Sequence, residues 1–410
     1  MRCLWHSESQ KAIWHGTTSV VATDGQGLEF KMKRVFTAAA LGLSLLVASG
    51  GAGFAQGLSK GQAALKKGAY AEALREFQPL AKQGNADAQY GLGLMYYKGQ
   101  GVAQDYKEAA RLFGLAAAQG DASAQYNLGV MYFKGQGVAQ DYKEATRLYG
   151  LAAAQTDADA QYNLGLMYDQ GKGVTQDYKQ AARLYGLAAA QGVAEAQYNL
   201  GVMYGKGQGV TQDYREAARL YGLAVAQGKA NAQVNLGVMY YNGQGVTQDY
   251  KEALRLYGLA AAQGDADAQR SLAFMYANAN GVPQSYAQAA KWYRLAADQG
   301  NSSAQNNLAV MYEIGQGVPK DYAQAVKWYR LAAEQGNASS QKNIGSMYAG
   351  GRGLAQDDVY AHMWYSIAAS GGKDSAVKSR DLIAQKMTAA NIAKAQGLAR
   401  ACVAKKYKGC

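Results

Sequence analysis

The feature that most constrains this chain is a 36-residue pattern that occurs eight times without an insertion or deletion. One glutamine marks the register of each copy: Gln89, Gln125, Gln161, Gln197, Gln233, Gln269, Gln305 and Gln341. A repeat of this length is a single supersecondary unit that cannot bury its own apolar surface, so neighbouring copies must stack. The sequence therefore predicts a stacked array instead of the two or three globular domains that 410 residues would otherwise suggest.

Each copy is expected to contain two amphipathic helices joined by a glycine turn. In the second copy, apolar residues recur at helical spacing over residues 124–132. This first helix is predicted to begin after the N-cap Asp121 and to end at Gly135. The second helix opens with Asp141 and has Glu144 three residues later, which is the pattern of a capping box. Strand signals are absent, so the pattern predicts an all-α fold of stacked helix hairpins.

The beginning of the chain has the organisation of an export signal. Residues 1–31 match nothing that follows, and we interpret them as a mis-annotated extension ahead of a true start at Met32. In residues 32–55, Lys33 and Arg34 precede an apolar stretch, and a small-x-small site predicts cleavage after Ala55. We therefore expect an exported protein, with the bacterial periplasm as its location. An inner-membrane anchor formed by an uncleaved signal, or secretion, are the alternatives.

Two unrepeated segments flank the array. Residues 56–85 contain the second helix of the repeat behind a shorter turn and are interpreted as a degenerate N-terminal cap. Residues 86–373 are the eight repeats, and residues 374–410 are expected to form a C-terminal capping helix and a basic tail that contains cysteine. From residue 373 onward there are nine basic and two acidic residues. This charge suits an anionic envelope surface, although a solvated tail is the alternative. Nucleic acid is not expected, because base-stacking aromatic residues are not interleaved with the charges.

Cys402 and Cys410 form a candidate disulfide. On one continuous helix, eight residues would span about 12 Å, whereas a disulfide needs Cα atoms within about 7 Å. An intramolecular bridge therefore requires the helix to end near Lys405, and Gly409 makes a reversal feasible. Export favours oxidation. Intermolecular pairing and free thiols are the alternatives.

Most catalytic chemistry is excluded by counting residues. After cleavage, one histidine remains, His362, and two cysteines, so neither a zinc set nor a Ser/His/Asp triad can be assembled. No phosphate-binding glycine motif follows a strand. The carboxylates recur in every copy as helix caps, whereas a catalytic pair should be singular. We therefore expect no enzyme activity, no cofactor and no metal site.

The pattern A-x-x-N-L-G-x-M-Y-x-x-G-x-G-V-x-x-D-Y-x-x-A resembles the Sel-one-like repeat (SLR) family, which is related to the tetratricopeptide (TPR) repeat. The resemblance covers residues 86–373 and implies a right-handed α–α superhelix, or solenoid, with an adaptor role in protein–protein interaction. Some cysteine-rich relatives are described as β-lactam-binding or β-lactamase-like. This chain lacks their cysteines, so the resemblance does not carry that activity here.

The resemblance also indicates a binding surface, because the first helix of a TPR-like hairpin lines the concave side. Asparagine side chains there can donate to and accept from an extended peptide backbone, and tyrosine rings add contact area. The alternatives are hydrogen bonding of the asparagines within their own hairpins and packing of the tyrosines between repeats. The candidate groove residues are Tyr126, Asn127, Tyr162, Asn163, Tyr198, Asn199, Asn235, Asn307 and Asn343.

Differences between the copies divide the array. The tyrosine register breaks at Val234, Arg270, Asn306 and Lys342, so the C-terminal half stands apart. The leading hypothesis is a non-enzymatic scaffold or adaptor that holds protein or peptide partners in the cell envelope through its concave groove. The alternatives are an envelope glycan- or peptidoglycan-binding protein and a β-lactamase-like hydrolase. Function is expected to depend on residues that change between copies, such as Phe133, Asp169, Gly205 and Glu313.

Overall fold

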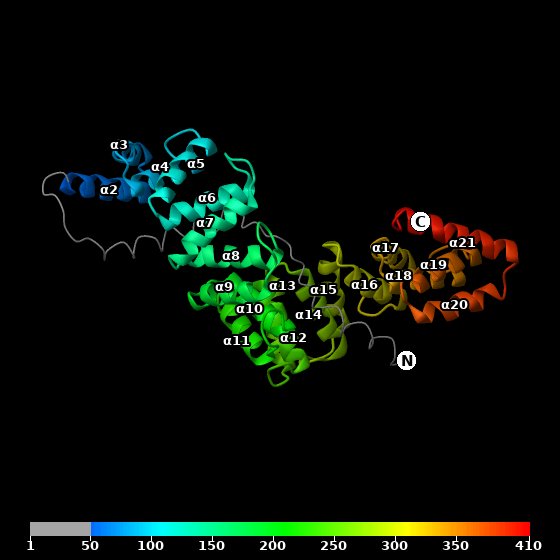
Figure 1. Cartoon of the computed structure of the whole chain (residues 1–410). Helices are drawn as coiled ribbons and strands as arrows, with labels where there is room; N and C mark the ends of the chain where they lie inside the picture. The colour runs from blue at the N-terminus through cyan, green and yellow to red at the C-terminus, as the bar shows by residue number, and fades with distance from the viewer. Residues whose placement is uncertain (1–50) are drawn as a thin grey trace. The chain divides into compact units, whose positions relative to one another are not determined.

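The computed structural model describes residues 51–410, with side chains described from Ala55 onward (Figure 1). The predicted extension and most of the predicted signal peptide lie outside these residues. The chain divides into two compact units, Met1–Leu220 and Tyr221–Cys410. Throughout the described residues the secondary structure is entirely α-helical, as the hairpin pattern predicted.

The helices follow one another as hairpins. Unit 1 contains α2 (Gly51–Lys66), α3 (Tyr70–Lys82), α4 (Ala86–Lys98), α5 (Tyr106–Ala118), α6 (Ala122–Lys134), α7 (Tyr142–Ala154), α8 (Ala158–Gln170), α9 (Tyr178–Ala190) and α10 (Ala194–Lys206). The unit boundary falls within α11 (Tyr214–Ala226). Unit 2 contains α12 (Ala230–Asn242), α13 (Tyr250–Ala262), α14 (Ala266–Asn278), α15 (Tyr286–Asp298), α16 (Ser302–Ile314), α17 (Tyr322–Ala333), α18 (Ala338–Gly350), α19 (Asp358–Ser370), α20 (Asp374–Ala384) and α21 (Ala389–Ala404).

The helix ends are set by the caps that the pattern predicted, with one difference. The Asp121 carboxylate accepts from the backbone N–H of Ala124 at 2.6 Å, and Gly135 ends α6 in the left-handed region with φ 69°. Asp141 accepts from two backbone N–H groups of α7. The predicted reciprocal half of the capping box is wrong, because the Glu144 carboxylate accepts from Arg147 at 2.6 and 2.8 Å instead.

The backbone explains why Glu144 does not reach back to the N-cap. The N–H of Asp141 already donates to the carbonyl of Tyr132 at 3.0 Å. Because the Asp141 N–H already has an acceptor, the Glu144 carboxylate would satisfy no free donor by folding back toward the N-cap. Arg147 lies one turn further along the same helix face and is the charged partner within reach. The equivalent residues of α5 and α13 make the same two-bond pair between glutamate and arginine.

Close packing within a hairpin depends on a glycine in the first helix. The Tyr149 side chain of α7 is buried, and a Cβ placed at Gly129 of α6 would lie only 2.9 Å from its ring. The same relation joins Gly165 to Tyr185. These glycines therefore let an aromatic ring of the second helix lie close to the first helix backbone.

A second glycine joins each repeat to the one before it. Gly137 in the turn after α6 has φ 72°, and a Cβ there would overlap the carbonyl group of Tyr106 at the start of α5. Gly173 lies in the same way against Tyr142. Two independent constraints therefore require glycine at this second position of the turn: the positive φ angle, and the lack of space for a Cβ beside the neighbouring helix.

The glutamines that mark the register are buried and link helices; we call them the glutamine ladder. Gln125 is only 4% exposed. Its Nε2 donates to the carbonyl of Ala117 in the preceding repeat at 3.2 Å, and its Oε1 accepts from Gln155 at 2.9 Å. The sequence pattern marked these residues without revealing this role. The Ala117 carbonyl also accepts from the N–H of Gly120 at 3.0 Å, so the ladder adds a second donor to a carbonyl near the end of the helix.

Helices α20 and α21 cap the end of unit 2, and both pack on α19 (Figure 1). The sequence predicted one or two helices in this segment, and the structure contains two. Beyond α21 the chain reverses through Lys406 and Tyr407, whose φ angles are 51° and 65°. The N–H of Tyr407 donates to the carbonyl of Cys402 at 2.9 Å. This reversal brings the last residues back along the helix that they leave.

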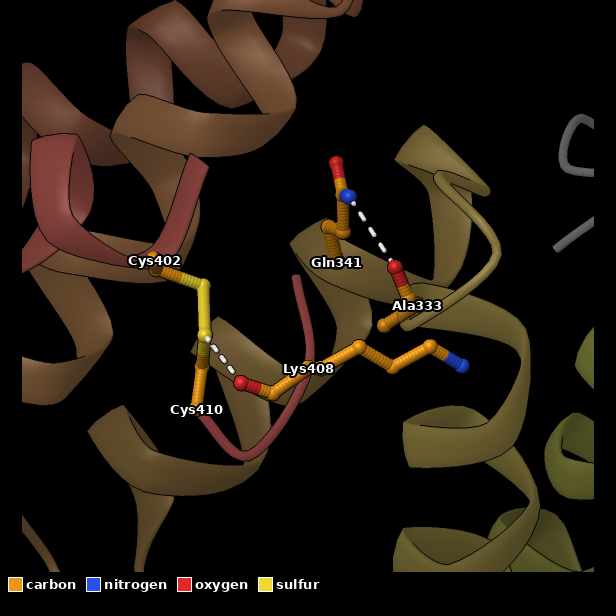
Figure 2. The surroundings of a disulfide bond; sticks show 5 residues. All are labelled: Ala333, Gln341, Cys402, Lys408 and Cys410. Atoms are coloured by element: carbon orange, nitrogen blue, oxygen red, sulfur yellow. Dashed lines mark hydrogen bonds between the residues drawn. A yellow bond between two sulfur atoms is a disulfide. The ribbon is translucent and has the colours of Figure 1, made fainter. Parts of the chain in front are cut away.

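Figure 2 shows the bridge between Cys402 and Cys410, whose Cα atoms are 5.7 Å apart. The helix ends at Ala404, so the geometric condition for pairing these cysteines is met. The ring of Tyr407 lies near Gly336, and Lys408 lies 3.8 Å from the Glu334 carboxylate. The returning tail therefore lies against the end of α17, near the Gln341–Ala333 link of the glutamine ladder (Figure 2).

We expect reduction of this bridge to release the tail without unfolding the array. The mass of the oxidised protein should rise by two hydrogen atoms on reduction, and trypsin should then cut faster after Lys405, Lys406 and Lys408. The helical circular dichroism should not change, because an eight-residue separation closes only a small terminal loop. Two free thiols in freshly purified protein would contradict the bridge.

Candidate functional site

The candidate site is the surface of the first helices on which the predicted tyrosines and asparagines recur; we call it the first-helix face. In unit 1 it is formed by α4, α6, α8 and α10, each of which carries tyrosine at the same position: Tyr90, Tyr126, Tyr162 and Tyr198. In unit 2 the same position on α12, α14, α16 and α18 is occupied by Val234, Arg270, Asn306 and Lys342. The unit boundary thus coincides with the break in the tyrosine register.

The asparagines of unit 1 hydrogen-bond to neighbouring repeats as well as to their own helix. Asn163 Nδ2 donates to the carbonyl of Asp159 at 3.0 Å and to the hydroxyl of Tyr126 at 3.3 Å. Asn127 Nδ2 makes the equivalent bonds to Ser123 and to Tyr90, at 2.8 and 3.4 Å. Asn199 hydrogen-bonds to the hydroxyls of Tyr162 and Tyr185; burial raises the pKa of both tyrosines, and these hydrogen bonds offset only part of that rise.

In unit 2 the predicted asparagines have less uniform partners. Asn235 donates to the hydroxyl of Tyr221 at 3.3 Å. Asn307 Oδ1 accepts from Asn306 at 3.2 Å, and Asn343 Nδ2 donates to Asn306 Oδ1 at 3.4 Å. Arg270 and Asn306 stand where a tyrosine would face Asn307 and Asn343, so the regular tyrosine–asparagine contact between repeats is lost at these two asparagines.

The tyrosines of unit 1 pack between helices and keep part of their surface exposed. The Tyr126 ring lies 5.9 Å from that of Tyr149, and the Tyr162 ring lies 5.8 Å from that of Tyr185. Burial raises the pKa of Tyr126 well above its ordinary value, and the nearby Asp159 carboxylate adds to this. These hydroxyls are therefore neutral hydrogen-bonding groups and do not take part in acid–base chemistry near pH 7.

The arrangement limits what the first-helix face can bind. The Nδ2 groups of Asn127 and Asn163 each donate once within their own helix and once to a tyrosine hydroxyl of the preceding repeat, so the group that each amide can still offer is its Oδ1 acceptor. A carbonyl oxygen can accept from the backbone N–H of an extended peptide, and a half-buried tyrosine edge can pack against that peptide's side chains. The face is thus suited to a partner that supplies donors.

Side chains that differ between repeats contact other residues of the array, either in the next repeat or in their own. Phe133 lies 5.5 Å from the Lys172 ammonium group. Glu313 accepts from Arg352 at 2.6 Å and from the Tyr329 hydroxyl at 2.7 Å. Asp169 accepts from Tyr185 at 3.3 Å, and burial raises its pKa. The residues that vary between copies thus contribute to contacts inside the array. The cation–π pair of Phe133 and the ion pair of Glu313 each belong to one junction between two repeats.

The other groups of residues 51–410 that bear on chemistry are the metal-ligating side chains and one buried histidine. No group of three or more His, Cys, Asp and Glu that could hold a metal ion lies there. His362 is 3% exposed, with its Nδ1 3.4 Å from the Ser366 hydroxyl. Burial, together with the Arg380 charge, lowers the pKa of His362, so its ring is neutral near pH 7.

These features define an α-solenoid built from stacked helix hairpins. The family profile of the Sel1 repeat matches eight consecutive segments, residues 86–121, 122–157, 158–193, 194–229, 230–265, 266–301, 302–337 and 338–373. The chain therefore belongs to the Sel1 repeat family, as the sequence pattern indicated. Proteins of this family generally mediate protein–protein interactions and are typically scaffolds without catalytic activity.

Two solved structures support this assignment. One is c5321, a protective antigen present in uropathogenic Escherichia coli strains displaying an SLR fold; it is 31% identical, covers 82% of this chain and 88% of its own, and gives a TM-score of 0.58. The other is a Sel1 repeat protein from Oxalobacter formigenes, which is 32% identical, covers 60% of this chain and 96% of its own, and gives a TM-score of 0.54. A comparison with curated proteins found no match.

Among the helices of residues 51–410, none has both the length and the apolar character needed to cross a bilayer.

Proposed function

We propose that this protein is an exported, non-catalytic scaffold of the cell envelope that holds extended segments of partner proteins on the first-helix face of unit 1. The observation that carries the proposal is the regular series of half-buried tyrosines on α4, α6, α8 and α10, with asparagine amide oxygens beside them on α6, α8 and α10. Such a series offers repeated acceptors and apolar edges at a constant spacing, which suits a main chain more than one particular side chain. The family's general role in protein–protein interaction supports the same function.

The location rests on the two ends of the chain. The signal-peptide pattern of residues 32–55 supports export, with the periplasm as the proposed compartment. At the other end, Lys405, Lys406 and Lys408 are exposed beside the disulfide. A basic end of this kind supports contact with an anionic envelope surface while the repeats hold a partner.

A photoreactive amino acid at Tyr162 tests the proposed surface. In cells that make the full chain, ultraviolet light should join this position to a specific protein, to be identified by mass spectrometry after a wash at high salt. Leu151 is the matched control, because it is 42% exposed on the second helix of a neighbouring repeat. A probe there should give no such adduct.

A third probe tests the choice of unit. Lys342 occupies the position of Tyr162 on a first helix of unit 2. A specific adduct at Lys342 with none at Tyr162 would show that the wrong unit was chosen. Co-sedimentation with purified peptidoglycan, with no protein adduct at either position, would favour a glycan-binding protein instead.

A further inference from the structure

A cleft between the last three helices lies outside the repeated tyrosine and asparagine positions. Helices α20 and α21 both pack on α19 and have no comparable packing against each other. The space between them is a cleft of about 590 Å³. Its floor is formed by Ser366 and Ile367 of α19, and its walls are formed by Arg380 of α20 and Arg400 of α21, among other residues.

Arg380 and Arg400 line this cleft from different helices, and none of its lining residues is acidic. Arg380 donates through Nε and Nη2 to the exposed Asp381 carboxylate at 2.9 and 2.7 Å, which leaves its Nη1 group for another acceptor. Arg400 is exposed and has no acidic partner in residues 51–410. Two positive charges facing one cleft favour an anion between them, and guanidinium groups bind carboxylates with a well-matched geometry.

The rest of the lining is apolar or neutral. Ile367, Ala399 and Val403 line the cleft, and Val403 is 44% exposed to solvent. His362 lies buried next to Ser366, and burial followed by the Arg380 charge lowers its pKa. The positive charge of the cleft therefore comes from the arginines. A fully hydrated ion such as inorganic phosphate would leave the apolar wall unused, whereas a ligand with an anionic head and an aliphatic body would cover it.

We propose that this cleft binds the free C-terminal carboxylate of a peptide that ends in an aliphatic residue. The carboxylate lies between Arg380 and Arg400, and the aliphatic side chain packs on Ile367 and Val403. The strongly basic segment from residue 373 onward, with nine basic and two acidic residues, adds a long-range attraction for an anionic chain end. This cleft is separate from the first-helix face, so the proposal for the cleft can be tested independently of the proposed function.

Calorimetric titration of the full chain with N-acetyl-leucyl-valine tests the proposal. The free acid should bind at least tenfold more tightly than the same dipeptide with a C-terminal amide, because the amide carries no charge. The double variant Arg380→Gln/Arg400→Gln should lose at least tenfold in affinity for the acid. The matched control is Lys394→Gln, which removes an exposed charge from α21 without touching the cleft and should bind as the original protein does.

A second variant tests binding in the cleft independently, in case the double variant does not fold. Val403→Asp places a negative charge at an exposed position of the same wall and should also abolish binding of the acid. Equal binding of acid and amide, no binding of the acid, or an equal loss in Lys394→Gln would overturn the proposal. Octanoate binding as tightly as the dipeptide would assign the cleft to free fatty acids instead, and equal binding of inorganic phosphate would refute the role of the apolar wall.

Discussion

Replacing Gly137 by alanine should destabilise unit 1 by about 3 kcal/mol or more, a large loss for a single methyl group. The glycine has φ 72°, a conformation in which a side chain is strained by about 1–2 kcal/mol. The new methyl would also overlap the carbonyl group of Tyr106, which is backbone at the start of α5 and cannot rotate away. The junction between two repeats would have to open to accommodate it.

Gly150→Ala is the matched control within the same hairpin. Gly150 lies inside α7, and a Cβ there would meet nothing within 4 Å. Because alanine is the better helix former, this change should stabilise the protein by up to about 1 kcal/mol. Denaturant unfolding followed by circular dichroism gives both values, and hydrogen exchange should show the loss in Gly137→Ala centred on α5 and the turn after α6. Similar effects of the two substitutions would refute the packing role of Gly137.

The repeat period explains why so much of the fold could be predicted from the sequence. Because the period is strictly 36 residues, the pattern around each helix boundary can be compared in eight copies. The N-cap Asp121 and the C-cap Gly135 were therefore predicted correctly. Local chemistry determines these positions, because a cap acts on backbone groups within one turn of itself. The prediction failed at Glu144, whose choice between two partners depends on a backbone bond to Tyr132 across the turn.

The candidate site was less predictable, because periodicity identifies a position without identifying its partner. Asn163 was predicted to line a binding groove, but its Nδ2 donates to Tyr126 of the preceding repeat. Glu313 was chosen because it varies, and its partner Arg352 lies 39 positions further along the chain. The cleft between α20 and α21 lies partly in a segment with no period at all. Contacts between repeats, and contacts of unrepeated helices, are tertiary information that a pattern of 36 residues does not contain.

The glutamine ladder gives the other large effect that we expect. Gln125→Glu keeps the shape of a buried side chain and replaces its donor by an acceptor that can ionise. The carboxylate would face the Ala117 carbonyl, to which Gln125 now donates, and would be only 4% exposed. At pH 7 the substitution should cost about 3 kcal/mol, because a buried charge is left without a positively charged partner.

The pH dependence distinguishes this mechanism from a general loss of packing. Burial should raise the pKa of the new carboxyl group in the folded protein above its unfolded value of about 4.3. Below that value both states are protonated and the penalty is absent; as the pH rises, ionisation favours the unfolded state, and stability falls by up to about 1.4 kcal/mol per pH unit until the folded pKa is reached. The protonated form can also donate to Ala117 as glutamine does.

Gln140→Glu provides the comparison, since Gln140 is exposed and donates to the carbonyl of Phe133. This substitution should cost less than about 1 kcal/mol and show little change between pH 4 and 7, because water solvates the new charge. Urea unfolding of both variants and the original protein across this pH range provides the measurement. A Gln125→Glu penalty that is as large at pH 4 as at pH 7 would mean that shape, and not the hydrogen bond between repeats, is what this glutamine contributes.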